Sequence, residues 1–116
     1  EASFASESSQ EMNKAALIHN VYFWVKEGTT DEQLASFEKG LKKLGTCPQI
    51  DQYYWGAPAS TIARDVVDHS YAYAINVHFA SVELQEEYQT EPIHLAFIED
   101  HKDIWSKVIV YDNEVN

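Results

Sequence analysis

The stretch Leu17–Val25, which reads LIHNVYFWV, is the clearest structural signal in the sequence. It is rich in β-branched and aromatic residues and contains no glycine or proline, so it predicts a β-strand. Alternate side chains of a strand point to opposite faces. One predicted face is mainly apolar but includes a histidine: Leu17, His19, Val21, Phe23 and Val25. The other face is aromatic and polar: Ile18, Asn20, Tyr22 and Trp24.

A helix is predicted after this strand. Thr30 and Gln33 have the spacing of a capping box, and Gly45 followed by Pro48 indicates where the helix ends. Between these limits apolar residues recur at helical intervals: Leu34, Phe37, Leu41 and Leu44. This stripe predicts that one side of the helix packs against a core.

Two strands are predicted after the helix, over residues 51–56 and 71–79, with a loop over residues 57–70 between them. The second of these strands reads YAYAINVHF and alternates cleanly, which predicts that Tyr71 and Tyr73 share its apolar face.

The C-terminal part predicts two helical pieces and a last strand. Ser81 caps a helix that ends near residue 89, and Pro92 starts a second helix that runs to about residue 103. Residues 105–112 form the last strand. The order β-α-β-β-α-β predicts an α+β protein with the ferredoxin-like split β-α-β fold, in which helices cover one face of a four-stranded antiparallel sheet.

The uncovered face of that sheet would expose several aromatic side chains. Tyr22, Trp24, Ile109 and Tyr111 are predicted to lie there, beside polar residues such as His78. A monomer would leave this large apolar patch in water. We therefore predict a two-fold homodimer joined sheet to sheet, a dimeric α/β barrel.

Composition and charge exclude several classes of protein. The 116 residues suffice for one domain, and the formal net charge of −11 disfavours contact with nucleic acid or an anionic membrane surface. No apolar run approaches the roughly 20 residues that span a bilayer. Cys47 is the only cysteine, and the histidines lack paired spacing, so neither a disulfide, a metal site nor a cofactor is predicted. His69 and His101 are expected on the solvated surface.

The N-terminal segment has a different composition from the rest. Residues 1–15 are rich in serine, alanine and glutamate, which predicts a flexible segment ahead of a domain over residues 16–116. Such a segment is expected either after a cleaved export signal or as a remnant of expression, so the compartment stays open between exported and cytoplasmic.

Several motifs, taken in order, resemble the stress-responsive dimeric A/B barrel (Dabb) domain family. They cover nearly the whole predicted domain. The motifs are Ile18-His19-Asn20-Val21, Tyr54-Trp55-Gly56, Phe79-Ala80-Ser81-Val82-Glu83, Tyr88-Gln89-Thr90-Glu91-Pro92-Ile93-His94, Phe97, Trp105 and the strand that ends at Asp112. The resemblance implies the same dimeric ferredoxin-like fold.

The resemblance also implies a site. A polyketide-cyclising member of the family uses a tyrosine and a histidine that fall on Tyr88 and His94, and a histidine that lines its pocket falls on His19. The other implied pocket positions are Val21, Phe23, Phe37, Ile75, Phe97, Trp105, Val108, Val110 and Asp112. Gly40 stands where that member has a bulkier aromatic residue, so the pocket shape is expected to differ. Some members hold a cation on backbone carbonyls after the first helix, a feature without a sequence signal.

The chemistry of these residues suggests a hypothesis. His94 lies in the first turn of a helix, where the helix dipole disfavours imidazolium, so a neutral ring nitrogen can accept a proton. The Tyr88 hydroxyl can donate to a developing enolate, and a small apolar or aromatic ligand would suit the surrounding side chains. Two alternatives remain open: a non-catalytic, stress-protective structural dimer, and a cofactor-free monooxygenase-like protein. Whether the chain is an enzyme is also open.

Overall fold

The computed structural model describes residues 15–116, and these form one four-stranded antiparallel sheet. The strands are β1 (Leu17–Val25), β2 (Gln52–Gly56), β3 (Tyr73–Phe79) and β4 (Trp105–Glu114), in the order β2-β3-β1-β4. β1 lies in the centre, because it pairs with both β3 and β4. The predicted ferredoxin-like fold is confirmed. The predicted flexible segment lies outside the described residues, apart from Ala15.

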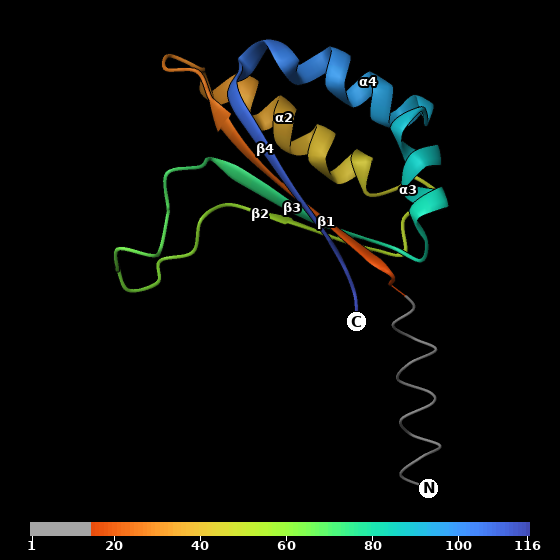
Figure 1. The fold of residues 1–116 in the computed structure, drawn as a ribbon. Helices are drawn as coiled ribbons and strands as arrows, with labels where there is room; N and C mark the ends of the chain where they lie inside the picture. The colour runs from red at the N-terminus through yellow and green to blue at the C-terminus, as the bar shows by residue number, and fades with distance from the viewer. Residues whose placement is uncertain (1–14) are drawn as a thin grey trace, which may run out of the picture.

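Three helices cover one face of the sheet, and the opposite face carries none of them (Figure 1). They are α2 (Asp31–Leu44), α3 (Val82–Gln89) and α4 (Pro92–His101). The last predicted helix is shorter than expected, because a tighter 3₁₀ turn, η1 (Lys102–Ile104), replaces its final residues. The chain then enters β4 directly.

Local hydrogen bonds fix the start of each helix. The capping box of α2 is present, since Thr30 N–H donates to Gln33 Oε1 and Gln33 N–H donates to Thr30 Oγ1. At α4 the Glu91 carboxylate accepts from the backbone N–H of Ile93 at 3.0 Å, and Pro92 occupies the first turn. The Glu91 cap and Pro92 fix the first turn of α4, and this turn carries His94.

The core lies between the helices and the sheet. Phe37, Leu41 and Leu44 of α2 are buried, and they meet Val77 and Phe79 of the inner sheet face, which are both fully buried. The predicted apolar stripe of α2 is therefore confirmed, with Leu34 packed only partly against the core. Burial of this kind supplies most of the stability of a small domain.

The predicted placement of the Tyr71 side chain is wrong. Tyr71 lies before β3 rather than in it, and its ring packs on the uncovered face, 5.1 Å from the centroid of Tyr22 and 6.3 Å from that of Trp24. The sequence alternation continues through this segment, but the Trp24 indole N–H donates to Ser70 Oγ at 3.0 Å and holds the chain against the uncovered face. Regular pairing begins only at Tyr73.

Candidate functional site

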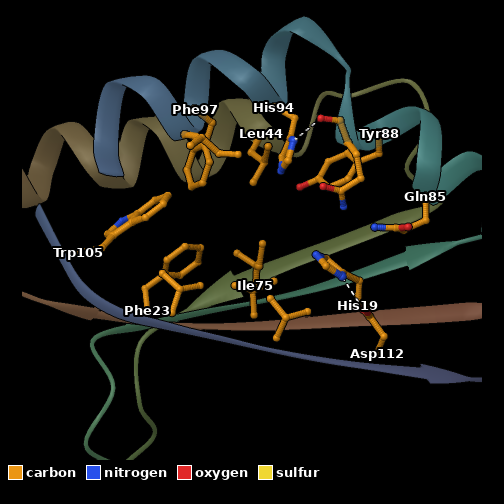
Figure 2. Close-up of a pocket in the computed structure, with 15 residues that line it drawn as sticks. His19, Phe23, Leu44, Ile75, Gln85, Tyr88, His94, Phe97, Trp105 and Asp112 are labelled. Carbon is orange, nitrogen blue, oxygen red and sulfur yellow. Dashed lines mark hydrogen bonds and ion pairs between the residues drawn. The ribbon is translucent and has the colours of Figure 1, made fainter. Parts of the chain in front are cut away.

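A cavity of about 320 Å³ lies between the inner face of the sheet and the helices α3 and α4. The side chains around it come from β1, β3, β4, α2, α3 and α4, so distant segments of the chain meet there (Figure 2). The predicted site residues that line the cavity are His19, Val21, Phe23, Ile75, Tyr88, His94, Phe97, Trp105, Val108, Val110 and Asp112.

Phe37 is the one predicted site residue that does not line the cavity. Its side chain is fully buried behind the cavity wall, with its ring 5.3 Å from that of Phe23 and 5.7 Å from that of Phe97. It lies on the core side of α2, so it supports the wall and cannot contact a ligand without a rearrangement.

Four lining residues were not predicted: Leu44, Gln85, Gln89 and Ile98. Gln85 and Gln89 lie three residues before and one residue after Tyr88 on α3, and positions 85 and 89 are four apart, so they share one side of the helix. Once Tyr88 is placed at a cavity, this helical spacing predicts that Gln85 and Gln89 lie near the same cavity. Leu44 was predicted as part of the core stripe, and only the fold shows that its side chain reaches the cavity.

His94 has a defined tautomer in this site. Its Nδ1 lies 3.3 Å from the backbone carbonyl oxygen of Gln89, which can only accept, so we assign the proton to Nδ1. The other ring nitrogen, Nε2, is then unprotonated, and Figure 2 shows it directed into the space between helix and sheet. Burial lowers the pKa of His94 below its ordinary value, and a charge on His19 lowers it further, against the opposing bond to Gln89. The ring is therefore a neutral proton acceptor near neutral pH.

Tyr88 lies beside this acceptor. Its side chain is fully buried, and its ring centroid is 4.3 Å from that of His94. The hydroxyl has no hydrogen-bond partner within residues 15–116. Burial raises the pKa of Tyr88 far above its ordinary value, and negative charge on Cys47 or Tyr53 would raise it further, so the hydroxyl stays protonated. An unpaired buried hydroxyl costs about 1–3 kcal/mol. Because this oxygen has almost no accessible surface, a bound molecule can accept its hydrogen bond only after a movement of neighbouring side chains.

A second histidine faces the cavity from the sheet. His19 on β1 is directly opposite Asp112 on β4, and its Nδ1 is hydrogen-bonded to Asp112 Oδ1 at 2.5 Å. The carboxylate fixes the ring orientation, and Figure 2 shows the other ring nitrogen turned toward the cavity. The His19 side chain is 9% exposed whereas that of Asp112 is 47% exposed, so the pair spans the boundary between cavity and solvent.

The cavity has a polar end and an apolar end. His19, Tyr88 and His94 lie at one end with Gln85, while Phe97 and Trp105 lie at the other (Figure 2). Two valines of β4 at the cavity edge, Val108 and Val110, are 40% and 46% exposed, so the cavity opens to solvent along this strand. This shape suits a small molecule with one polar group and an apolar tail.

Cys47 is not equipped for nucleophilic chemistry. It is buried, and burial together with the negative charge of Glu91 raises its pKa to about 11, so the thiol stays protonated. Over residues 15–116, no three histidine, cysteine, aspartate or glutamate side chains gather closely enough to hold a metal ion. Nor does this part of the chain contain a helix with the length and apolar character needed to cross a membrane.

His101 was predicted on the solvated surface, but the structure shows it partly buried. Its ring packs 5.4 Å from the ring centroids of both Phe37 and Phe97, and burial lowers its pKa. A Cβ atom at Gly40 would collide with this ring, so the space that a larger residue would take at position 40 is filled from α4 instead.

Solved structures share this architecture. A hydroxynitrile lyase from Passiflora edulis superposes with a TM-score of 0.74 at 19% identity, covering 89% of this chain and 95% of that one. A dimeric ferredoxin-like protein from Thermobifida fusca superposes with a TM-score of 0.73 at 18% identity, covering 87% of this chain and 92% of that one. At these identities the comparison establishes the fold.

Sequence comparison gives the family. Olivetolic acid cyclase from Cannabis sativa is 26% identical over 98 residues, which are 84% of this chain and 94% of that protein. The family model described as the stress responsive A/B barrel domain matches residues 17–115, and the chain therefore belongs to this family.

Proposed function

We propose that the cavity binds a small carbonyl compound with an apolar tail and that His94 removes a proton from the carbon next to the carbonyl. The observation that carries this proposal is the bond between His94 Nδ1 and the Gln89 carbonyl, which leaves Nε2 as an unprotonated acceptor facing the cavity. Burial supports it, because a lowered pKa keeps the imidazole neutral at the pH where it must act.

The proton and electron pair can be followed through this step. The C–H bond breaks, its proton moves to His94 Nε2, and its electron pair delocalises onto the carbonyl oxygen as an enolate. The Tyr88 hydroxyl, which has no other partner in the described residues, is available to donate to that oxygen. In the exchange reaction the enolate carbon takes a proton back from His94 Nε2 and the carbonyl re-forms. In a cyclisation the enolate carbon instead attacks a second carbonyl carbon of the same molecule, the π electron pair of that carbonyl moves onto its oxygen, and this oxygen takes the proton from His94 Nε2. That a similar protein is named a cyclase supports this class of chemistry.

The test is deuterium exchange into an unreactive ketone. The protein is incubated in D₂O with methyl ketones that carry alkyl or phenyl tails, and exchange next to the carbonyl is followed by NMR. We expect exchange above the buffer rate with the native protein and none with His94→Gln. His69→Gln is the matched control, because His69 bonds Thr61 on a loop outside the cavity. Equal rates for the native protein and His94→Gln would rule out this base, and no exchange with any ketone would rule out the reaction.

The structural alternative makes a different prediction about the cavity. A dimer without chemistry would be expected to fill this space with its own side chains, and the open volume of about 320 Å³ argues against that alternative. The monooxygenase-like alternative stays a prediction, and oxygen uptake with anthrone-like or haem substrates would test it.

We also propose that two copies associate through the uncovered face of the sheet. Tyr54 and Tyr111 on this face are 58% and 61% exposed, although large aromatic side chains favour burial. A hollow of about 330 Å³ lies between Tyr22, Trp24 and neighbouring residues on the same face. Similar solved structures are described as dimeric, which supports the proposal. Sedimentation equilibrium tests it: a single species at the mass of one chain would end it.

A further inference from the structure

The loop between β2 and β3, residues 57–70, is a projecting arm. It extends beyond the sheet and clear of the three helices (Figure 1). The arm has its own internal bonds, although it contains no helix or strand. Thr61 Oγ1 and His69 Nε2 are 2.9 Å apart and close its neck, and the N–H of Val67 donates to the carbonyl of Arg64 in a turn at its tip. The arm therefore has two hydrogen bonds of its own, one at its neck and one in its turn.

The tip of the arm presents two aliphatic side chains to solvent. Ile62 is 84% exposed and Val66 is 81% exposed, the two highest values among the exposed large hydrophobic residues of the described chain. Single exposed aliphatic residues are common, but here one lies just before the turn and the other within it, so the tip offers two apolar side chains for contact.

The tip also carries the only arginine of the sequence. Arg64 lies between the two aliphatic residues and is exposed, and it makes no ion pair within residues 15–116. The chain as a whole carries a net charge of −11, from 19 acidic and 8 basic residues. Arginine is enriched at interfaces. The arm also contains Asp65 and Asp68, so it has no net positive charge, and only the Arg64 side chain itself can pair with a carboxylate of a partner.

We propose that the arm is a clasp that packs against a second copy of this chain. This proposal rests on the homodimer proposed above and adds to it a contact outside the sheet. The neck of the arm adjoins the uncovered face, because Ser70 accepts the Trp24 indole N–H and Tyr71 packs against Tyr22. The base of the arm is therefore continuous with the uncovered face, and the arm extends from there beyond the sheet. Ile62 and Val66 lose their solvent contact in the dimer, and Arg64 meets an acidic partner.

The test compares dimer dissociation constants by sedimentation equilibrium. Replacing both aliphatic residues, Ile62→Ser with Val66→Ser, is expected to raise the dissociation constant by at least about tenfold, because each dimer loses the apolar contacts of both arms. The matched control is Val82→Ser with Leu95→Ser, two aliphatic residues on α3 and α4 that are 47% and 50% exposed. We expect this control to leave the dissociation constant unchanged. Circular dichroism checks that both variants fold.

A charge variant gives an independent reading. With Arg64→Gln, dimerisation is expected to weaken in low salt, since one positive charge that can pair with a partner carboxylate is removed from each arm, and the difference from the native protein is expected to shrink in high salt, where charges are screened. Control and arm variants with the same dissociation constant would overturn the clasp while leaving the dimer intact. A native protein that stays monomeric would overturn both assembly proposals, and the deuterium-exchange assay would still decide the chemistry separately.

Discussion

The two faces of the sheet place histidines in opposite surroundings. His19 points to the covered face, where it is buried and bonded to Asp112 at the edge of a cavity. His78, on the neighbouring strand, points to the uncovered face, where its Nε2 bonds the amide oxygen of Asn76 at 2.6 Å beside the exposed ring of Tyr54. Both strands are paired in register, so a difference of one residue position decides which environment each ring enters. The covered face encloses a cavity, whereas the uncovered face leaves large aromatic side chains exposed.

The largest expected effect concerns the covered face. His94→Ala is expected to lower turnover of a responsive ketone by about 10²- to 10⁴-fold, the usual contribution of a general base. The fold should persist, because His94 is only partly buried and the cap of α4 is made by Glu91. Deuterium-exchange rates measured beside urea unfolding curves check both statements. A variant that unfolds in parallel with its loss of activity would assign His94 a structural role instead.

A pair of aromatic truncations contrasts the two faces directly. Phe79→Ala on the covered face removes a fully buried ring and is expected to lower the free energy of unfolding by about 3–5 kcal/mol at every protein concentration. Tyr111→Ala on the uncovered face removes a 61% exposed ring, so its cost should be small in dilute protein and grow with concentration. Urea unfolding at two concentrations distinguishes them. If Tyr111→Ala lowers the free energy of unfolding by the same amount at both protein concentrations, this face is not part of a dimer interface.

On the covered side of the sheet, helices α2 and α4 pack closely where Gly40 faces the ring of His101. Gly40→Ala forces a Cβ atom against the His101 ring, so it is expected to lower the free energy of unfolding by about 1 kcal/mol or more. In a His101→Ala background the clash is gone, and the same change should stabilise α2 by about 0.5–1 kcal/mol. Thermal unfolding of the four proteins measures this reversal of sign. If Gly40→Ala also stabilises the protein that retains His101, the His101 ring moves aside without a measurable cost.

The smallest expected effect is on pH dependence. Burial lowers the pKa values of His94 and His101 below the ordinary value of 6.5, so between those values the unfolded chain binds more protons than the folded one. Their contribution to stability is therefore complete above pH 6.5 and is lost as the pH falls through the lowered pKa values. Unfolding curves from about pH 7.5 to pH 5 should show a smaller loss for His94→Gln than for the native protein. Identical losses would mean that His94 titrates normally.

The candidate site was predictable where local pattern and family resemblance coincide. Tyr88 and His94 flank the break at Pro92, and the structure brings their rings together within 4.3 Å between centroids. The pairing of His19 with Asp112 could not be read from either strand alone, because the two residues are 93 positions apart and meet only through the register of β1 and β4. Phe37 is buried, as the helical stripe predicted, but it does not line the cavity as the family resemblance implied, because it lies behind the cavity wall.

The sequence by itself determined the order of elements, the cap of α2 and the division of each strand into two faces. These features depend on residues within a few positions of one another, whose backbone preferences and hydrogen bonds act locally. The tertiary structure alone decided the cavity, the tautomer of His94, the partial burial of His101 and the projection of the arm. Each of these depends on which distant side chains share the same space, and that is set when helices pack on the sheet and the strands take one register.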